Sequence, residues 1–461
     1  MLDKNDLQEV LKIALKNGGD FAEIYLERKK TTSVACEANK IERVVTGNDV
    51  GAGIRVITGE NTLYAFTNDL SKKGLTDVAE VISRATQGAK KDLTIDLVKS
   101  KPDVDFSILK RPEEVSIDSK VEVVEKTNKL ARSIDERIKQ VTVGYGDVVQ
   151  KVTIANSEGV FVEDERIRTR LVVNAVAVEN GQIQTGYEAV GGHAGFDYLE
   201  MNQPEDLARK AVGRALLMLE AKPAPAGKMP VVMAGEAGGT MVHEACGHGL
   251  EADLVQKQLS VYRGKKGQQV ASELISVIDD GTICQKYGSF RFDDEGTPSQ
   301  KTVLIENGVL KGYMYDYLTA KKEGRKSTGN GRRESYQDRP IPRMTNTYIA
   351  PGKDKAEDII RDTKKGLLVK KMGGGQVNTT TGDFVFEVTE GYLIKNGEIT
   401  MPVRGATLTG NGPQALTIVD AVGGDLGFAI GTCGKDGQGV PVSDAQPTLR
   451  IPELIVGGIL D

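Results

Sequence analysis

A short stretch near the middle of the chain sets the strongest limit on how this sequence folds. Lys222-Pro-Ala-Pro-Ala-Gly227 places two prolines among small residues. The helical pattern before it cannot continue through these residues, because proline lacks a backbone N–H and restricts the residue that precedes it. The chain has 461 residues, enough for more than one hydrophobic core. We therefore place a domain boundary here, with one domain at residues 1–221 and a second at 228–461.

The first domain has the pattern of an α+β fold in which helices form one layer and a sheet the other. Asn180-Gly181 lies between Val-Ala-Val and Gln-Ile, which is a strong signal for a tight two-residue hairpin. Alternation of apolar and polar residues around it indicates paired strands. The predicted helices are 4–17, 71–87, 118–135 and 204–220, and the predicted strands are 21–26, 32–36, 53–58, 62–66 and several within 138–192.

The second domain is expected to be antiparallel and rich in β-structure. It opens with a short apolar run at 230–234, followed by a helix-like segment at 236–254. Asn307-Gly308 and Asn396-Gly397 mark two later hairpins, because this dipeptide favours the tight turns that join paired strands. The chain has 53 glycines without a fixed period, which indicates many turns rather than a fibrous repeat.

Charge and the start of the chain exclude several kinds of partner. The net charge is −5, with both signs interspersed and no basic block, so neither nucleic acid nor a membrane is expected as a main partner. Residues 1–19 have an amphipathic pattern rather than that of a signal peptide, and we expect a cytoplasmic protein. The four cysteines, at 36, 246, 284 and 433, are then expected to be mostly free, buried thiols.

The segment that carries chemistry is His243-Glu244-Ala-Cys-Gly-His248. The chain has only three histidines, and two of them lie here, five positions apart. Neutral imidazoles bind zinc, and a catalytic zinc lowers the pKa of a bound water to about 7. A carboxylate beside the first histidine then takes the proton of the water as it attacks a carbonyl. We predict that His243 and His248 bind zinc and that Glu244 is the catalytic base.

The five-residue spacing requires a distorted helix. In a regular α-helix it would separate the two imidazoles by about 140°, too far apart for one ion. A single-turn π-bulge would bring both side chains to one side, and such bulges often mark functional sites. Loosening of the helix at Gly247 and Gly249 is the alternative. We favour the π-bulge; an unbroken α-helix with diverging imidazoles would be incompatible with the predicted site.

The motif resembles the His-Glu-x-x-x-His motif of the TldD/PmbA family, the so-called modulators of DNA gyrase, and specifically of its TldD branch. The resemblance extends from about 230 to 450 and is weaker in the first half of the chain, at 21–26 and 51–55. The matching blocks are Gly249-Leu-Glu-Ala-Asp253, Asp293-Asp-Glu-Gly-Thr-Pro-Ser-Gln300, Leu304-Ile-Glu-Asn-Gly-Val-Leu-Lys-Gly-Tyr313, Thr328-Gly-Asn-Gly-Arg-Arg-Glu-Ser-Tyr336, Pro342-Arg-Met-Thr-Asn-Thr347, Gly382-Asp-Phe-Val-Phe386 and Gly431-Thr-Cys-Gly-Lys435.

The resemblance implies a metallopeptidase subunit with an N-terminal α+β domain and a β-rich C-terminal domain. It implies that the third metal ligand is the cysteine of the Gly-Thr-Cys-Gly block, which is Cys433 here. It also implies a partner subunit of PmbA type (TldE) without the metal motif, in a heterodimer, with a homodimer as the alternative. Such a pair encloses a cavity that admits unfolded polypeptides or short peptides and cleaves them with little sequence preference.

Several residues outside the motif are candidates for supporting roles. A thiolate is a strong zinc ligand, and the glycines beside Cys433 permit close backbone approach. Glu251 follows the second motif histidine by three residues and is placed to accept a hydrogen bond from a metal-bound imidazole. His193 is a candidate for stabilising a developing oxyanion, with a structural role as the alternative. Arg332 and Arg333 are candidates for binding the C-terminal carboxylate of a peptide, with a charged loop as the alternative.

Two other functions are compatible with these residues. In the first, the metal is structural and the chain is a non-catalytic modulating or binding subunit; Glu244 disfavours this, because a closed structural site needs no base. In the second, Cys246 or Cys433 acts with His248 as a thiol hydrolase, which would be sensitive to alkylation and insensitive to chelators. Our prediction is a zinc-dependent metallopeptidase subunit that hydrolyses peptide bonds in unfolded segments or short peptides.

Overall fold

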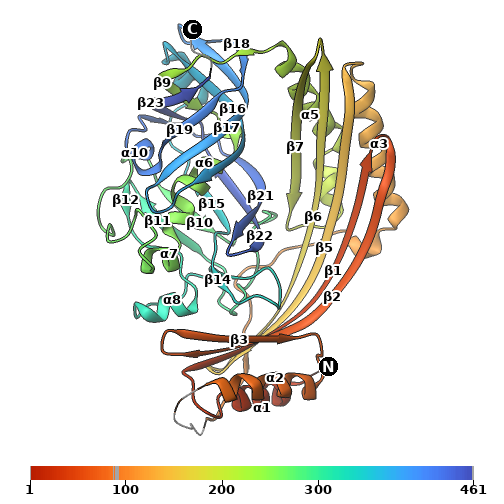
Figure 1. The fold of residues 1–461 in the computed structure, drawn as a ribbon, viewed down its shortest axis with the longest axis vertical. Helices are drawn as coiled ribbons and strands as arrows, with labels where there is room; N and C mark the ends of the chain where they lie inside the picture. Colours follow the sequence, from red (N-terminus) through yellow and green to blue (C-terminus); the bar gives the residue numbers. More distant parts are fainter. Residues whose placement is uncertain (1, 87, 89–92, 459–461) are drawn as a thin grey trace.

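The computed structural model describes residues 2–86, 88 and 93–458 and shows a mixed α+β protein. Figure 1 shows two β-rich parts beside each other: a long, curved sheet from the first half of the chain and more strongly coiled sheets from the second half. The second half begins within the proline-containing stretch, with β8 (Lys222–Pro223) and β9 (Gly227–Met233). None of the described helices is long and apolar enough to cross a bilayer.

The first half forms one seven-stranded sheet with the order β3-β2-β1-β5-β6-β4, and β7 also pairs with β6. Its long strands are joined by tight hairpins. The predicted turn at Asn180-Gly181 is confirmed, since both residues have the positive φ, 48° and 78°, that such turns need. The strands are β1 (Phe21–Glu37), β2 (Lys40–Thr58), β3 (Asn61–Thr67), β4 (Val98–Lys99), β5 (Ile138–Asn156), β6 (Val160–Glu179) and β7 (Gln182–Gly192).

The prediction of two separate strands at 21–26 and 32–36 is wrong, because β1 runs through both without a break. The residues between these two runs, at 27–31, are all polar. Glu27 is nevertheless completely buried, where it accepts hydrogen bonds from the side chain of Gln150 and from the backbone N–H of Tyr336. The strand is therefore continuous because its polar side chains find partners in the neighbouring strand and in the second half of the chain.

Helices cover the sheet at its two ends. Figure 1 shows α1 and α2 packed together below one end and α3 and α5 along one face towards the other. Asp3 caps the first helix through a reciprocal capping box. The four predicted helices are confirmed with small shifts at their ends; residue 87 of the second lies outside the described residues. The helices are α1 (Lys4–Ala14), α2 (Lys72–Ala85), α3 (Ile117–Ser133), α4 (Asp197–Met201) and α5 (Pro204–Glu220), with a 3-10 turn at Pro112–Glu114.

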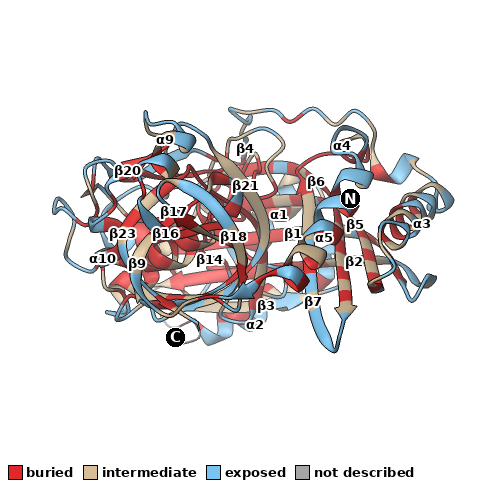
Figure 2. Ribbon diagram, turned by 90° about the horizontal axis from the view of Figure 1, so that it is seen from above, coloured by how far each residue is buried: buried red, intermediate tan, exposed pale blue. Residues whose placement is uncertain are grey.

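The second half contains a closed barrel and a six-stranded sheet. In the barrel the order is β16-β9-β23-β19-β17, and pairing of β16 with β17 closes it, which gives the ring seen from above in Figure 2. The sheet has the order β12-β11-β10-β15-β22-β21. The bounds are β10 (Val277–Asp280), β11 (Lys301–Glu306), β12 (Val309–Leu310), β13 (Gly331–Arg332), β14 (Ile341–Pro342), β15 (Asn346–Ile349), β16 (Lys365–Val377), β17 (Asp383–Lys395), β18 (Glu398–Arg404), β19 (Thr407–Asn411), β20 (Ala421–Val422), β21 (Gly427–Lys435), β22 (Gln438–Gln446), β23 (Leu449–Gly457), α8 (Tyr317–Lys322), α9 (Ala356–Arg361) and α10 (Gly412–Thr417).

The predicted helix at 236–254 is a series of short helical turns rather than one continuous helix. Its glycines explain the interruptions: a Cβ at Gly239 would lie 2.2 Å from the backbone nitrogen of Ala445, so the chain must approach β22 closely before it turns. The π-bulge prediction is confirmed, since His243–Gly247 is a π-helical turn. The turns are η2 (Gly235–Ala237), α6 (Thr240–Val242), η3 (His243–Gly247), η4 (His248–Leu250) and α7 (Ala252–Gln256).

The two halves meet in a buried network of charges. Arg55 of β2 pairs with Glu23 of β1 at 2.8 Å and with Glu295 of the second half at 2.7 Å. Arg333 of the second half also pairs with Glu23, at 2.5 Å. The Asp293–Glu295 segment forms a turn, and its three acidic side chains are buried. A buried charge that loses its partner is strongly destabilising. These ion pairs therefore specify how the two halves pack against each other.

Candidate metal centre

The π-turn and one β-hairpin bring three potential metal ligands together. His243 and His248 lie at the beginning and just beyond the end of the π-turn, and Cys433 lies on β21. Their ligand atoms all lie within 4.8 Å of one another. The Sγ atom of Cys433 is 3.5 Å from Nε2 of His248. The extra residue of the π-turn thus removes the divergence that a regular helix would impose on the two imidazoles.

A carboxylate lies at the Nδ1 atom of each imidazole and orients the ring. Nδ1 of His243 lies 3.0 Å from Oδ1 of Asp444, and Nδ1 of His248 lies 3.0 Å from Oε2 of Glu251. The expected pairing of Glu251 with a motif imidazole is therefore confirmed. In a neutral imidazole whose Nδ1–H is bonded to a carboxylate, Nε2 carries no proton and can bind a metal. Both Nε2 atoms are thus prepared as ligands.

The electrostatics of the cluster favour a thiolate. Burial raises the pKa of Cys433, but the two neighbouring imidazoles outweigh it and bring this pKa down to about 5. Burial lowers the pKa of His248, but Glu251 and Cys433 raise it to about 9. Two imidazole nitrogens and one thiolate sulfur match the ligands that zinc prefers, and three protein ligands leave a position open. The donor set therefore fits a catalytic zinc ion.

Glu244 lies in the wall of a cavity that opens beside this cluster. The cavity has a volume of about 730 Å³ and is also lined by His243, His248 and Cys433, by Gly374 and Gly375 of β16, and by β21. The Glu244 carboxylate is partly exposed and makes no hydrogen bond to the described part of the chain. Burial raises its pKa, and the two imidazoles oppose this. The carboxylate is thus free to act on a molecule within the cavity.

Glu251 is held in place by a lysine that the sequence analysis did not identify. Nζ of Lys435 lies 3.1 Å from Oε2 of Glu251 and 2.6 Å from Oδ1 of Asp253. Burial raises the pKa of Glu251, but Lys435 and His248 outweigh it and lower this pKa to about 2. The carboxylate therefore stays ionised behind the imidazole.

Asp444 was also missed, although the sequence contains a signal for it. The hairpin turn near Asp436-Gly437 pairs Cys433 with Val440 and Ala429 with Asp444. Cys433 and Ala429 are an even number of residues apart, so their side chains and those of their partners lie on one face of the hairpin. The register of this hairpin would have placed the Asp444 carboxylate on the same face as Cys433, four residues along the strand from its partner Val440.

Cys246 lies within the π-turn but away from the other ligands. Its side chain is fully buried, and its thiol donates a hydrogen bond to the carbonyl oxygen of Val242 at 3.2 Å. Burial raises its pKa to about 12. It does not line the cavity beside Glu244. A buried, protonated thiol of this kind is neither a metal ligand nor a nucleophile.

The three candidate substrate contacts lie elsewhere. His193 is buried, with Nδ1 3.0 Å from the carbonyl oxygen of Ser289 and its ring against Phe106. Arg332 and Arg333 are buried between the two halves, where Arg332 donates to backbone carbonyls and Arg333 pairs with Glu23. None of the three lines the cavity beside the metal ligands.

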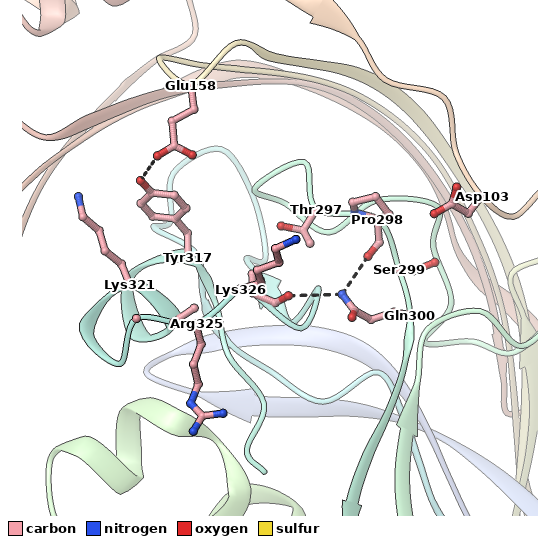
Figure 3. A pocket seen from close by; sticks show the side chains of 13 residues that line it. Asp103, Glu158, Thr297, Pro298, Ser299, Gln300, Tyr317, Lys321, Arg325 and Lys326 are labelled. Carbon is pink, nitrogen blue, oxygen red and sulfur yellow. Dashed lines mark hydrogen bonds between the residues drawn. The ribbon is translucent and has the colours of Figure 1, made fainter. Parts of the chain in front are cut away.

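A second large cavity is shown in Figure 3. Its volume is about 750 Å³, and Tyr317, Lys321 and Arg325 are among the residues that line it. The Tyr317 hydroxyl donates a hydrogen bond to Glu158 at 2.6 Å. The described lining contains neither histidine nor cysteine, so this cavity offers no comparable set of soft metal ligands.

Models of one protein family match most of the chain. The model of the PmbA/TldA metallopeptidase C-terminal domain matches residues 226–458, that of the central domain residues 110–219 and that of domain 1 residues 22–89. The models divide the first half of the chain into two domains, and the boundary between 1–221 and 228–461 stays a prediction.

Relatives match over nearly the whole chain. A metalloprotease TldD homolog of Haemophilus influenzae is 37% identical over 99% of this chain and 97% of its own length. A zinc metalloprotease TldD homolog of Saccharolobus solfataricus is 28% identical over 97% of this chain and 99% of its own.

Solved structures share the fold. A candidate modulator of a DNA gyrase from Thermotoga maritima has a TM-score of 0.81 at 25% identity, covering 98% of this chain and all of that one. TldE from Thermococcus kodakarensis has a TM-score of 0.79 at 22% identity, covering 98% of this chain and 100% of its own. The matches to the family models and to the H. influenzae relative show that the chain belongs to the PmbA/TldD metallopeptidase family, on its TldD side.

Proposed function

We propose that this chain is the catalytic subunit of a zinc-dependent peptidase. The observation that carries the proposal is that Glu244, a carboxylate without a hydrogen-bond partner in the described chain, lines the same cavity as His243, His248 and Cys433. A purely structural metal would need neither an open cavity nor an adjacent base.

Zinc is the proposed cofactor. Its support is the two-imidazole, one-thiolate donor set and the name of the S. solfataricus relative, a zinc metalloprotease. When bound, zinc would act as a Lewis acid on the scissile carbonyl and on the attacking water. His243, His248 and Cys433 would hold it, and Asp444 and Glu251 would keep the imidazoles oriented.

Glu244 moves the proton in the proposed reaction. Its carboxylate takes a proton from the attacking water, and the resulting carboxylic acid gives this proton to the leaving amine. The raised pKa that burial gives Glu244 suits both steps, because a carboxyl nearer neutrality is a stronger base and remains a competent acid. The same residue therefore serves each half of the hydrolysis.

We propose unfolded segments or short peptides as substrates. β21 is the last strand in its sheet order, and it lines the same cavity as Gly374 and Gly375 of β16. An extended peptide would pair through its main chain with the open edge of β21, which is a mode of binding indifferent to most side chains. A folded substrate could not present an unpaired strand there.

A partner subunit of TldE type is also proposed. TldE from T. kodakarensis has the same fold as this chain, and subunits of one fold commonly assemble through equivalent surfaces. A homodimer is the alternative. In either assembly we expect the partner to cover the cavity and exclude folded proteins.

Zinc content and hydrolysis of an unfolded polypeptide test the proposal when they are measured together, with and without a TldE-type partner. Glu244→Gln keeps all three ligands and should bind zinc like the wild type, about one ion per chain, but lose hydrolysis by a factor of about a thousand or more. Glu236→Gln is the matched control, because Glu236 is exposed and its ion pair in the described part of the chain is with Lys370; it should retain activity.

Two results would select the other functions. Zinc in both proteins with hydrolysis in neither, even with the partner present, would favour a modulating subunit with a structural metal. Hydrolysis that resists chelators and is abolished by thiol alkylation would favour a thiol hydrolase.

A further inference from the structure

A small cavity lies between the long sheet of the first half and the β21–β22 hairpin. Its volume is about 300 Å³, the lower end of the range for small-molecule sites. The first half contributes residues of β1, β5 and β6, and the second half contributes Tyr287, Arg332 and Arg333 together with Thr432 and Pro441 of the hairpin. It shares one lining residue, Thr432, with the cavity that contains Glu244.

Positive charge dominates the lining. Five arginines and one lysine face three carboxylates, and each carboxylate already has a partner. Asp147 pairs with Lys120 at 2.7 Å, Asp294 pairs with Arg166 at 2.5 Å, and Glu334 accepts the backbone N–H of Gly439 at 2.6 Å. The cations of the lining are Lys29, Arg166, Arg168, Arg170, Arg332 and Arg333.

Two of the arginines are buried without any carboxylate partner in the described chain. Arg168 is 6% exposed and donates from Nε to the carbonyl of Tyr287 at 2.8 Å and from Nη2 to that of Ser289 at 3.0 Å. Arg332 is 4% exposed and donates from Nη2 to the carbonyl of Pro441 at 2.7 Å and from Nη1 to that of Met344. In the described part of the chain, Nη1 of Arg168 and Nε of Arg332 have no hydrogen-bond acceptor.

Burial without a carboxylate partner lowers the pKa of both guanidinium groups. Burial, followed by repulsion from Arg166, lowers the pKa of Arg168 to about 10. Burial, followed by repulsion from Arg168, lowers the pKa of Arg332 to about 9. A buried cation is stable only when an opposite charge or a full set of acceptors compensates it, and the carbonyls here supply only part of that compensation.

We propose that this cavity binds a small oxyanion, a carboxylate or a phosphate, between the guanidinium groups of Arg168 and Arg332. The planar fork of a guanidinium matches the paired oxygens of either group. Arg170, which is exposed, and Lys29, which is half-buried, add positive charge to the lining. This anion site is independent of the proposed peptidase function.

The anion site and the metal centre both adjoin the hairpin of β21 and β22. Thr432 and Pro441 are register partners, as are Cys433 and Val440 one position further along. Cys433 lines the cavity of the metal centre, and its neighbour Thr432 lines both cavities. A bound anion would stabilise the strand that carries the third metal ligand.

Calorimetric titration of the full chain with inorganic phosphate, and separately with acetate, tests the proposal, with sodium chloride held at equal ionic strength. We expect saturable one-site binding in the millimolar range or tighter. Binding of phosphate alone identifies a phosphate-bearing ligand, binding of acetate alone a carboxylate, and binding of both a general oxyanion site. Absence of saturable binding of either ion at tens of millimolar would overturn the proposal, whatever any variant does.

Variants then locate the site. Arg168→Gln and Arg332→Gln should each weaken binding roughly tenfold or more, the loss of one charged hydrogen bond. Arg209→Gln is the control, because Arg209 is exposed on α5; it should bind like the wild type. Arg168→Lys keeps the charge but loses the fork and should bind with intermediate strength. Unchanged affinity in both glutamine variants, in correctly folded protein, would place any bound anion elsewhere and overturn the proposal.

Discussion

Replacing Glu251 by glutamine isolates what the orienting carboxylate contributes to metal binding. Glu251 is fully buried, and its Oε2 accepts from His248 at 3.0 Å and from Lys435 at 3.1 Å, while Oε1 has no partner. Glutamine has nearly the same shape and can still accept the Nδ1–H of His248. The substitution therefore removes charge without leaving a hole.

The magnitude follows from the change in hydrogen-bond type. A hydrogen bond to a charged group contributes about 1.5 to 3 kcal/mol and a neutral one about 0.5 to 1.5 kcal/mol. The hydrogen bond that orients the imidazole of His248 should thus be about 1 to 1.5 kcal/mol weaker. This corresponds to a roughly tenfold weaker zinc affinity. This agrees with the 10- to 100-fold effects that orienting partners of metal ligands commonly have.

The assay is competition for zinc with a chromophoric chelator at neutral pH, using metal-stripped protein. Glu453→Gln is the matched control, because Glu453 pairs with Lys228 at 2.8 Å on the surface of β23 and should bind zinc like the wild type. A zinc affinity of Glu251→Gln within twofold of the wild type would refute the reasoning that this carboxylate orients His248.

Three further predictions test other parts of the structure. Burial raises the pKa of Cys246 to about 12, so only about one molecule in ten thousand should carry the thiolate at pH 8. Mass spectrometry of the native protein should find Cys246 unmodified by iodoacetamide and the exposed Cys284 modified. Equal labelling of both cysteines would contradict the buried state of Cys246. Gly247→Ala places a Cβ 2.2 Å from the sulfur of the buried Met344 and should lower the free energy of unfolding in urea by about 1 to 3 kcal/mol. Because the clash also shifts the π-turn, the rate of hydrolysis should fall by a larger factor than the stability does. Unchanged stability and activity would show that the turn tolerates a side chain. Glu23→Gln leaves Arg55 and Arg333 without their shared carboxylate and should cost about 3 to 5 kcal/mol in the same measurement, whereas a cost below 1 kcal/mol would show that the ion pairs do not hold the halves together.

The sequence was sufficient for those parts of the fold that local patterns determine. Helices with one apolar face were located nearly to the residue, as at Pro204–Glu220. Asn-Gly turns gave the hairpins, because the required positive φ is a property of two residues alone. The spacing of His243 and His248 even predicted the π-turn, because a shared ion excludes a regular helix at that spacing.

The parts that could not be predicted depend on contacts between distant segments. Glu27 looks like a loop residue until Gln150 and Tyr336 supply its hydrogen bonds. Asp293–Glu295 has the sequence of an exposed acidic turn, and its burial depends on the ion pair between Glu295 and Arg55 of the other half of the chain. Lys435 could not be linked to Glu251 for the same reason. Polar residues at such junctions follow no periodic pattern, since their burial is decided by their partners.

Zinc K-edge X-ray absorption tests most directly whether His243, His248 and Cys433 bind a single zinc ion. We predict one sulfur ligand at about 2.3 Å and nitrogen or oxygen ligands at about 2.0 to 2.1 Å in the wild type. Cys433→Ser should lose the sulfur contribution, whereas Cys246→Ser should keep it. A wild-type spectrum without sulfur, or a sulfur contribution that disappears in Cys246→Ser and persists in Cys433→Ser, would contradict the assignment of the site.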